Sequence, residues 1–90
     1  MFGGAGLYRD GVMFALVSDG EVFLKTDEQT VESFRTAGSR PFVYAKGGKE
    51  ATMSYWSLPE VALDDGDELK RWAELAFEAA RRAQSLRERR

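Results

Sequence analysis

Apolar runs alternate with Asp-Gly pairs in the first part of the sequence, a pattern typical of strands joined by tight turns. A short strand is predicted over residues 7–9, followed by Asp10-Gly11. The apolar run at residues 12–17 predicts a second strand, and residues 21–25 predict a third after Asp19-Gly20. Together these segments predict an antiparallel meander.

The second of these strands is apolar on both faces. Strict alternation places Phe14 with Leu16 on one face and Met13 with Ala15 on the other. A strand of this kind is typically covered on both sides or lies at an interface.

The period then changes from strand to helix. Thr26 and Gln29 have the spacing of a capping box, in which a hydroxyl caps the helix and Gln29 reaches back. Phe34 follows at helical spacing, Gly38 can end the helix in a left-handed conformation, and Pro41 prevents its continuation.

Two further strands are predicted over residues 42–46 and 50–57, around Gly47-Gly48. Acidic residues at 64–68 then precede a long amphipathic helix. Its apolar stripe is Leu69, Trp72, Ala73, Ala76, Ala80 and Ala83, with Phe77 and Leu86 at the margins.

The predicted order is therefore β-β-β-α-β-β-α, an α+β fold with a five-stranded antiparallel sheet in one domain over residues 1–90. Two helices, one of them short, are thin cover for a sheet whose second strand is apolar on both sides.

Composition excludes much enzyme chemistry, because the 90 residues include no His and no Cys. Imidazole acid–base catalysis, thiolate nucleophiles, disulfides and zinc fingers are therefore excluded. No catalytic constellation, cofactor site or metal site is predicted. The longest apolar run is too short for a membrane span and no secretory signal is visible, so we expect a cytoplasmic protein.

The net charge of −2 is unevenly distributed. Residues 79–90 carry five arginines against one glutamate, a balance of +4, and we expect this basic helix end to fray. The other residues carry 8 basic and 14 acidic side chains, a balance of −6. An acidic body argues against broad nucleic-acid binding.

Three motifs have both a functional and a structural interpretation. The carboxylates of Asp64, Asp65, Asp67 and Glu68 could bind a hard cation, but the spacing of an EF-hand is absent and helix capping, which explains all four, is the favoured interpretation. The Gly-rich segments at 3–6 and 47–49 lack the residues of a phosphate-binding loop. Aromatic and basic residues on the strands could stack bases, but they also suit an ordinary sheet.

Five blocks of sequence, in order, carry a family resemblance. They are Met1-Phe2-Gly3-Gly4-Ala5-Gly6-Leu7-Tyr8 with Asp10–Leu16, Leu24-Lys25-Thr26-Asp27, Ala37-Gly38-Ser39, Pro41-Phe42-Val43-Tyr44, and Ser54-Tyr55-Trp56 with Pro59-Glu60. In these blocks the chain resembles the amino-terminal domain of the TfoX/Sxy family, bacterial regulators of natural competence.

The resemblance implies a fold similar to type III secretion chaperones, α-β(3)-α-β(2)-α. Family members carry a first helix before the Met-Phe-Gly-Gly block, and the competence regulators carry a further carboxy-terminal domain. This sequence begins at that block, so we expect an apolar groove that a second copy fills, giving a homodimer. No catalytic residues are implied.

The predicted function is therefore a non-enzymatic regulatory module that binds a protein partner through its sheet and long helix. The candidate interaction residues, expected to be exposed or half-exposed, are Tyr8, Lys25, Tyr44, Tyr55 and Trp56. One alternative is a nucleic-acid accessory protein, and a small-molecule binder is another. In the nucleic-acid alternative the candidate phosphate contacts are Arg81, Arg82, Arg87, Arg89 and Arg90.

Overall fold

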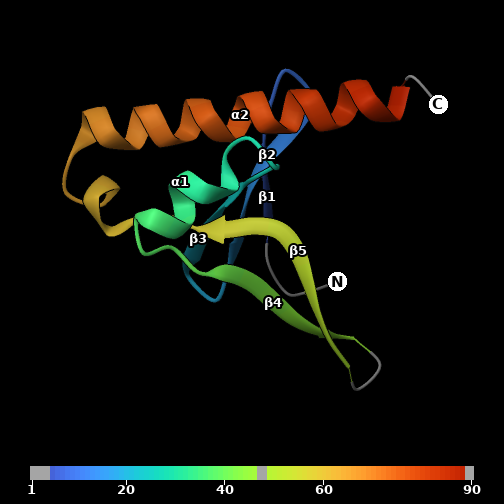
Figure 1. Cartoon of the computed structure of the whole chain (residues 1–90), viewed down its shortest axis with the longest axis horizontal. Coiled ribbons are helices and arrows are strands. Elements are labelled where there is room, and N and C mark those ends of the chain that lie inside the picture. Colours follow the sequence, from blue (N-terminus) through green and yellow to red (C-terminus); the bar gives the residue numbers. More distant parts are fainter. Residues whose placement is uncertain (1–4, 47–48, 89–90) are drawn as a thin grey trace.

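The computed structural model describes residues 5–46 and 49–88, with the side chains of residues 44–53 excepted. The element order predicted from the sequence is confirmed, with one additional 3₁₀ turn (Figure 1). The elements are β1 (Ala5–Arg9), β2 (Val12–Ser18), β3 (Glu21–Lys25), α1 (Val31–Thr36), β4 (Pro41–Lys46), β5 (Lys49–Ser57), η1 (Glu60–Ala62) and α2 (Gly66–Glu88). The Gly47-Gly48 turn lies outside the described residues.

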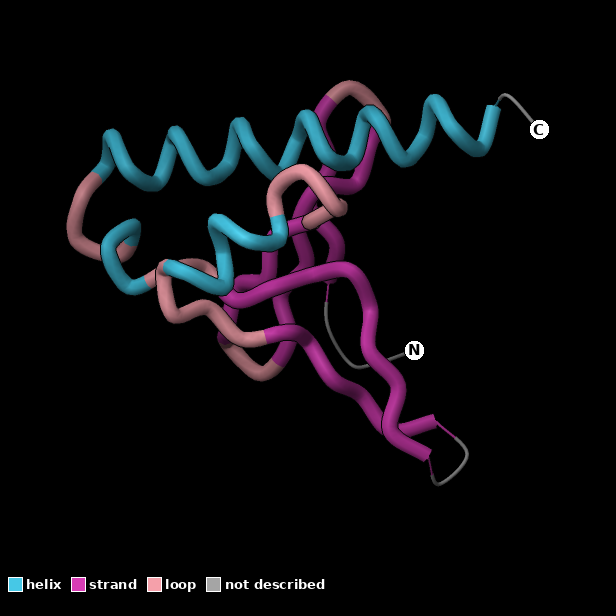
Figure 2. The backbone as a smooth tube through the Cα atoms, in the orientation of Figure 1, coloured by secondary structure: helices cyan, strands magenta, loops and turns pink. Residues whose placement is uncertain are grey.

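The five strands form one antiparallel sheet in the order β1-β2-β3-β5-β4. The predicted α+β class is therefore confirmed. The long helix α2 crosses one face of the sheet and packs against β2 and β3, as the tube in Figure 2 shows. Because β5 inserts beside β3, the end of the first meander lies next to a strand formed much later in the chain.

The two predicted hairpin turns have the expected backbone conformation. Asp10 and Asp19 have φ of 51° and 53°, and Gly11 and Gly20 each have φ of 76°. Positive φ at both central residues defines the type I′ turn, whose twist matches that of the flanking strands. Aspartate tolerates this region and glycine occupies it without strain.

A Gly20→Ala substitution should therefore destabilise the domain by about 1–2 kcal/mol, because its φ of 76° forces the new Cβ into a strained conformation. Gly66→Ala is the matched control. It makes the same chemical change at the first residue of α2, where the added Cβ meets nothing, and should be neutral or stabilising by about 0.4–1 kcal/mol. Urea unfolding of both variants measures the difference, and equal stabilities would contradict the turn assignment.

The predicted alternation along β2 is wrong at Phe14. The pairing of β1 with β2 runs from Leu7↔Ala15 directly to Tyr8↔Met13, so Phe14 is the extra residue of a β-bulge. Phe14 consequently lies on the same side as Ala15, against α2, where its ring meets that of Phe77 edge-on at 6.2 Å.

The core on the helix side joins the sheet to both helices. Phe34 of α1 is fully buried, and its ring lies 4.8 Å from that of Trp72 of α2. Ala15 of β2 and Ala76 of α2 are also fully buried, and such small side chains let the helix lie close to the sheet. The predicted apolar stripe of α2 is confirmed at Trp72, Ala76 and Ala80, whereas Leu69 is exposed.

The opposite face of the sheet has its own apolar cluster, formed by Leu16, Phe23, Phe42 and Tyr55. No helix among the described residues covers this face. Instead β5 bends sharply (Figure 2), and Phe42 of the edge strand packs its ring 4.8 Å from that of Phe23, two strands away. The curved sheet thus buries part of its own apolar face, which neither helix covers.

Candidate functional site

A groove of about 520 Å³ lies where the second half of α2 passes over the ends of β1, β2, β3 and β5. We call it the Lys25–Arg87 groove. Its apolar lining comes from the β1–β2 hairpin and from the small residues of α2, namely Val12, Met13, Ala80 and Ala83, together with Gly11. Its polar lining is Tyr8, Lys25, Tyr55, Gln84, Arg87 and Glu88.

The β-bulge and the strand pairing place these residues together. Because of the bulge, Met13 lies opposite Tyr8 on the face away from Phe14. The pairing of β3 with β5 sets Lys25 directly opposite Tyr55. The ammonium of Lys25 lies 5.3 Å from the centre of the Tyr55 ring.

Lys25 is half-buried, and its ammonium donates a hydrogen bond to Ser54 Oγ. Burial, together with the nearby charge of Arg87, lowers the pKa of Lys25 below its ordinary value, an effect that Asp27 partly offsets. Burial also raises the pKa of Tyr55. Among the described residues, Lys25 has no carboxylate within ion-pair distance.

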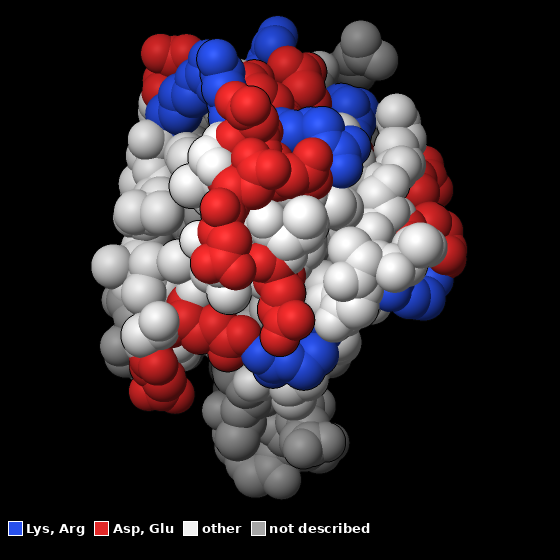
Figure 3. All heavy atoms as spheres, turned by 90° about the vertical axis from the view of Figure 1, so that its left-hand side faces the viewer, with Lys and Arg blue, Asp and Glu red and all other residues white. Residues whose placement is uncertain are grey.

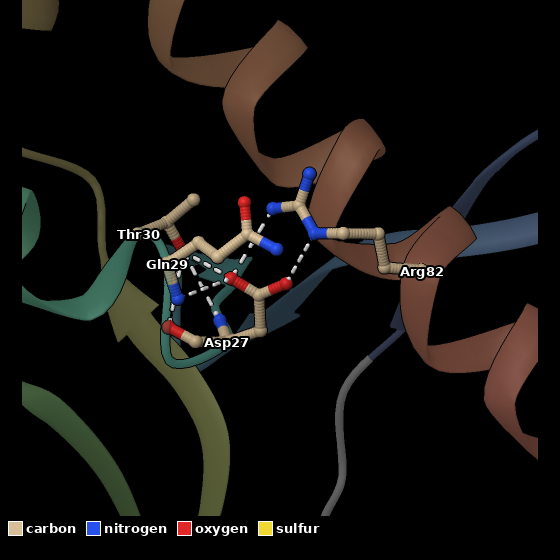
Figure 4. Close-up of polar contacts among 4 residues, drawn as sticks. All are labelled: Asp27, Gln29, Thr30 and Arg82. Atoms are coloured by element: carbon tan, nitrogen blue, oxygen red, sulfur yellow. Dashed lines mark hydrogen bonds and ion pairs between the residues drawn. The ribbon is translucent and has the colours of Figure 1, made fainter.

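Asp27 and Arg82 fasten α2 to the loop that follows β3. The guanidinium of Arg82 donates from Nε to Asp27 Oδ2 at 2.6 Å and from Nη2 to Oδ1 at 3.2 Å (Figure 4). The hydrogen bond from Arg82 is the main cause that lowers the pKa of Asp27 below its ordinary value. This pair, the Asp27–Arg82 clamp, ties the helix to the loop about one and a half turns before Arg87, which lines the groove.

The capping box predicted at Thr26 and Gln29 is wrong, and Asp27 takes part in the hydrogen bonds that replace it. Thr26 is buried and its hydroxyl donates to the backbone oxygen of Ser54, so it does not cap α1. Asp27 N–H instead donates to Thr30 Oγ1 at 3.0 Å, and Asp27 Oδ1 accepts from Gln29 N–H at 3.0 Å. These hydrogen bonds close the turn at residues 27–30 that leads into α1, which itself has no side-chain cap, and they use the carboxylate that also binds Arg82.

The predicted interaction residues do not all belong to one surface. Tyr8, with 65% of its surface exposed, Lys25 and Tyr55 line the groove. Tyr55 was expected to be at least half exposed and is only 7% exposed, because its ring belongs to the second apolar cluster. Trp56 is half-buried on the opposite face, against the core beneath α2, and the side chain of Tyr44 lies outside the described part.

The predicted phosphate-binding arginines are also separated. Arg81 pairs with Glu78 on the same helix, and Arg82 belongs to the clamp. Arg87 lines the groove, and Arg89 and Arg90 lie outside the described residues. Sequence reasoning missed Met13, Ala80 and Ala83 as lining residues and missed the clamp, because residues far apart in the sequence meet only in the folded sheet.

Carboxylates gather at the other end of α2, where Figure 3 shows a band of them over η1 and the start of the helix. Asp65 caps α2, since its Oδ1 accepts hydrogen bonds from the N–H groups of Asp67 at 2.9 Å and Glu68 at 3.3 Å. The capping interpretation is thereby confirmed for Asp65, while Asp67 and Glu68 lie in the first turn of the helix. Within residues 5–46 and 49–88, no three carboxylates lie close enough together to hold a metal ion.

A curved antiparallel sheet, a long helix across it and a groove lined by two cations define a small α+β domain. The chain belongs to the TfoX N-terminal domain family, whose model matches residues 1–80. The resemblance noted in the sequence is thus confirmed. No helix in the described ranges has the length and apolar character needed to cross a membrane.

Two relatives support this assignment. The chain is 33% identical over 61 residues to the DNA transformation protein TfoX1 of Aliivibrio fischeri (strain ATCC 700601 / ES114), covering 68% of this chain and 29% of that protein. It is 30% identical over 87 residues to Protein Sxy of Escherichia coli (strain K12), covering 97% of this chain and 42% of that protein. The chain thus spans less than half the length of either relative.

Proposed function

We propose that this domain is a non-enzymatic module of cytoplasmic regulators related to DNA transformation, and that it binds a protein partner through the Lys25–Arg87 groove. The observation that supports the proposal best is the groove itself, which brings together Tyr8, Lys25 and Arg87 from three separate elements. Aromatic residues, Met and Arg are enriched at protein–protein interfaces, and Tyr8, Met13 and Arg87 line the groove. The name of the relative TfoX1, a DNA transformation protein, supports the link to transformation.

The nucleic-acid alternative has weaker support. Arg81 and Arg82 are held by Glu78 and Asp27, so their charges are partly neutralised. A surface that follows a phosphate backbone needs several free cations in a row. The homodimer expected from the sequence stays a proposal, and sedimentation velocity at micromolar protein concentration tests it.

The proposed function is tested by affinity capture from a lysate of the source organism. Mass spectrometry compares the proteins recovered by the wild type with those recovered by a Tyr8→Ala variant. Tyr8 is exposed and belongs to neither apolar cluster, so its truncation should leave the melting temperature almost unchanged. We expect Tyr8→Ala to reduce recovery of a specific partner by roughly tenfold, as expected for loss of an aromatic anchor.

Leu86→Ala is the matched control, because Leu86 is 63% exposed on the same end of the molecule and does not line the groove. The control should retain the partner. Recovery that is equal for wild type, Tyr8→Ala and Leu86→Ala would contradict a binding role for the groove.

A further inference from the structure

The arginines in the described part of the chain differ in whether they form an ion pair with a carboxylate. All but one of them form an ion pair with a carboxylate of the same chain; these are Arg9, Arg35, Arg40, Arg71, Arg81 and Arg82. Arg87 is the exception within that part of the chain. In an otherwise acidic domain whose arginines are paired, an unpaired arginine beside an unpaired lysine is unusual.

Lys25 and Arg87, neither of which has an ion pair within the described part of the chain, line the same groove from different elements. Lys25 ends β3 and Arg87 lies in the last turns of α2. The charge of Arg87 reaches Lys25, since it contributes to lowering the pKa of that lysine. Asp27 offsets this only in part, since both of its oxygens accept hydrogen bonds from Arg82 and no ion pair joins it to Lys25 or Arg87 in the described part of the chain. An anion in the groove would relieve the repulsion between the positive charges of Lys25 and Arg87.

The rest of the lining restricts what kind of anion fits. Met13, Ala80 and Ala83 give the groove an apolar side, and Glu88 contributes a negative charge that is hydrogen-bonded to Gln84 Nε2 at 3.3 Å. A polyphosphate chain would bring several negative charges towards that carboxylate and would leave the apolar side without a partner, whereas a single carboxylate brings only one charge. A carboxylate next to an apolar side chain matches both the cations and the apolar side.

We propose that the groove binds a short acidic segment of a partner protein, with a carboxylate between Lys25 and Arg87 and an apolar side chain against Met13 and Ala83. This inference rests on the interaction role proposed above and adds the chemical class of the partner. The half-buried position of Lys25 strengthens the contact, because an ion pair there is less screened by water and salt than one at the open surface.

The test is fluorescence anisotropy with the full chain and a short labelled peptide in which Asp and Glu alternate with Leu and Phe. The same peptide with Asn and Gln at the acidic positions measures the contribution of charge. We expect the acidic peptide to bind and the neutral one to bind at least tenfold more weakly. Raising the salt concentration from about 0.05 to about 0.5 M should weaken binding of the acidic peptide severalfold.

Lys25→Gln and Arg87→Gln should each weaken binding of the acidic peptide by roughly five- to tenfold. Lys70→Gln is the matched control, since Lys70 is an exposed lysine of α2 outside the groove and its substitution makes the same charge change. Circular dichroism should show all three variants folded. The proposal would be overturned if the wild type and all three variants bound the acidic peptide equally well. It would also be overturned if the wild type bound the acidic and the neutral peptide with the same affinity.

Two further results would also overturn the acidic-partner assignment. One is tighter binding of a single-stranded oligonucleotide than of the peptide. The other is self-association that Arg87→Gln removes and the peptide displaces, which would identify a second copy as the occupant. If the peptide fails to bind but Tyr8→Ala still loses a captured partner, the acidic class is wrong and the interaction role stands. If neither effect is seen, both fail.

Discussion

Replacing Phe34 by alanine should lower the free energy of unfolding by about 3–5 kcal/mol. Phe34 is the buried residue of α1, its exposed fraction is 0%, and its ring packs edge-on against Trp72. The substitution opens a cavity between β2, β3, α1 and α2 that the surrounding side chains fill only in part. A domain of this length is stable by only about 5–13 kcal/mol, so the variant should lose a large share of its stability.

Thermal unfolding followed by circular dichroism measures this effect, with an expected decrease in the midpoint of at least about 12 °C. Phe34→Leu should fall between the wild type and Phe34→Ala, because it leaves a smaller cavity. Leu63→Ala is the surface control; Leu63 is 67% exposed, and its substitution should change stability by less than about 0.5 kcal/mol. A loss at Phe34 no larger than that at Leu63 would contradict the central position of α1.

The element order could be predicted because its signals are local. Asp-Gly pairs at 10–11 and 19–20 favour left-handed backbone conformations, which both turns adopt. Acidic residues at 64–68 predict a helix start, and Asp65 caps α2. The apolar character of both faces of residues 12–17 is also confirmed, since Ala15 and Leu16 are each fully buried on opposite faces.

Features that depend on partners far away in the sequence could not be predicted. The bulge at Phe14 lets that ring reach Phe77 of α2, and a period-2 pattern contains no sign of it. The capping hydrogen bonds form at Asp27 and Thr30, in the turn before α1, because the Thr26 hydroxyl donates to the backbone oxygen of Ser54. Propensity rules see only neighbours in the sequence, and tertiary contacts override them at these positions.

The candidate site illustrates the same limit. Tyr8, Lys25 and Tyr55 could be selected as residue types suited to binding, but their meeting depends on β5 pairing with β3. Trp56 follows Tyr55 directly and lies on the other face, since successive strand residues point to opposite sides. Arg87 was predicted as one of five equivalent arginines. Its distinction is the absence of an ion pair among the described residues, which only the folded structure reveals.

The Asp27–Arg82 clamp should contribute about 1–2 kcal/mol to stability, because two charge-assisted hydrogen bonds form at a partly buried position. Asp27→Asn and Arg82→Ala should each lose an amount of this order at neutral pH. The double variant should lose less than the sum of the two, since the second substitution removes a group whose partner is already gone. Arg81→Ala, which breaks only the exposed pair with Glu78, should lose less than about 0.5 kcal/mol.

The stability supplied by Asp27 should also depend on pH in a defined direction. Its pKa is lower in the folded state than in the unfolded chain, mainly because Arg82 donates to its ionised form. This contribution is therefore fully present above the unfolded value of about 3.9 and is lost as the pH falls through the lower, folded value. Urea unfolding from pH 7 downwards should show the difference between wild type and Asp27→Asn constant above about pH 5 and shrinking in acid.

Loss of the clamp should also weaken binding of the acidic peptide, although neither Asp27 nor Arg82 lines the groove. Arg82 fixes α2 about one and a half turns before Arg87, so without it the helix end can move away from Lys25. Arg82→Ala should therefore reduce peptide affinity by roughly threefold to tenfold at neutral pH, where Arg81→Ala leaves it unchanged. Hydrogen exchange should be faster at the amides of residues 82–88 in Arg82→Ala than in Arg81→Ala. If exchange and affinity are the same in the two variants, the clamp stabilises the fold without organising the groove.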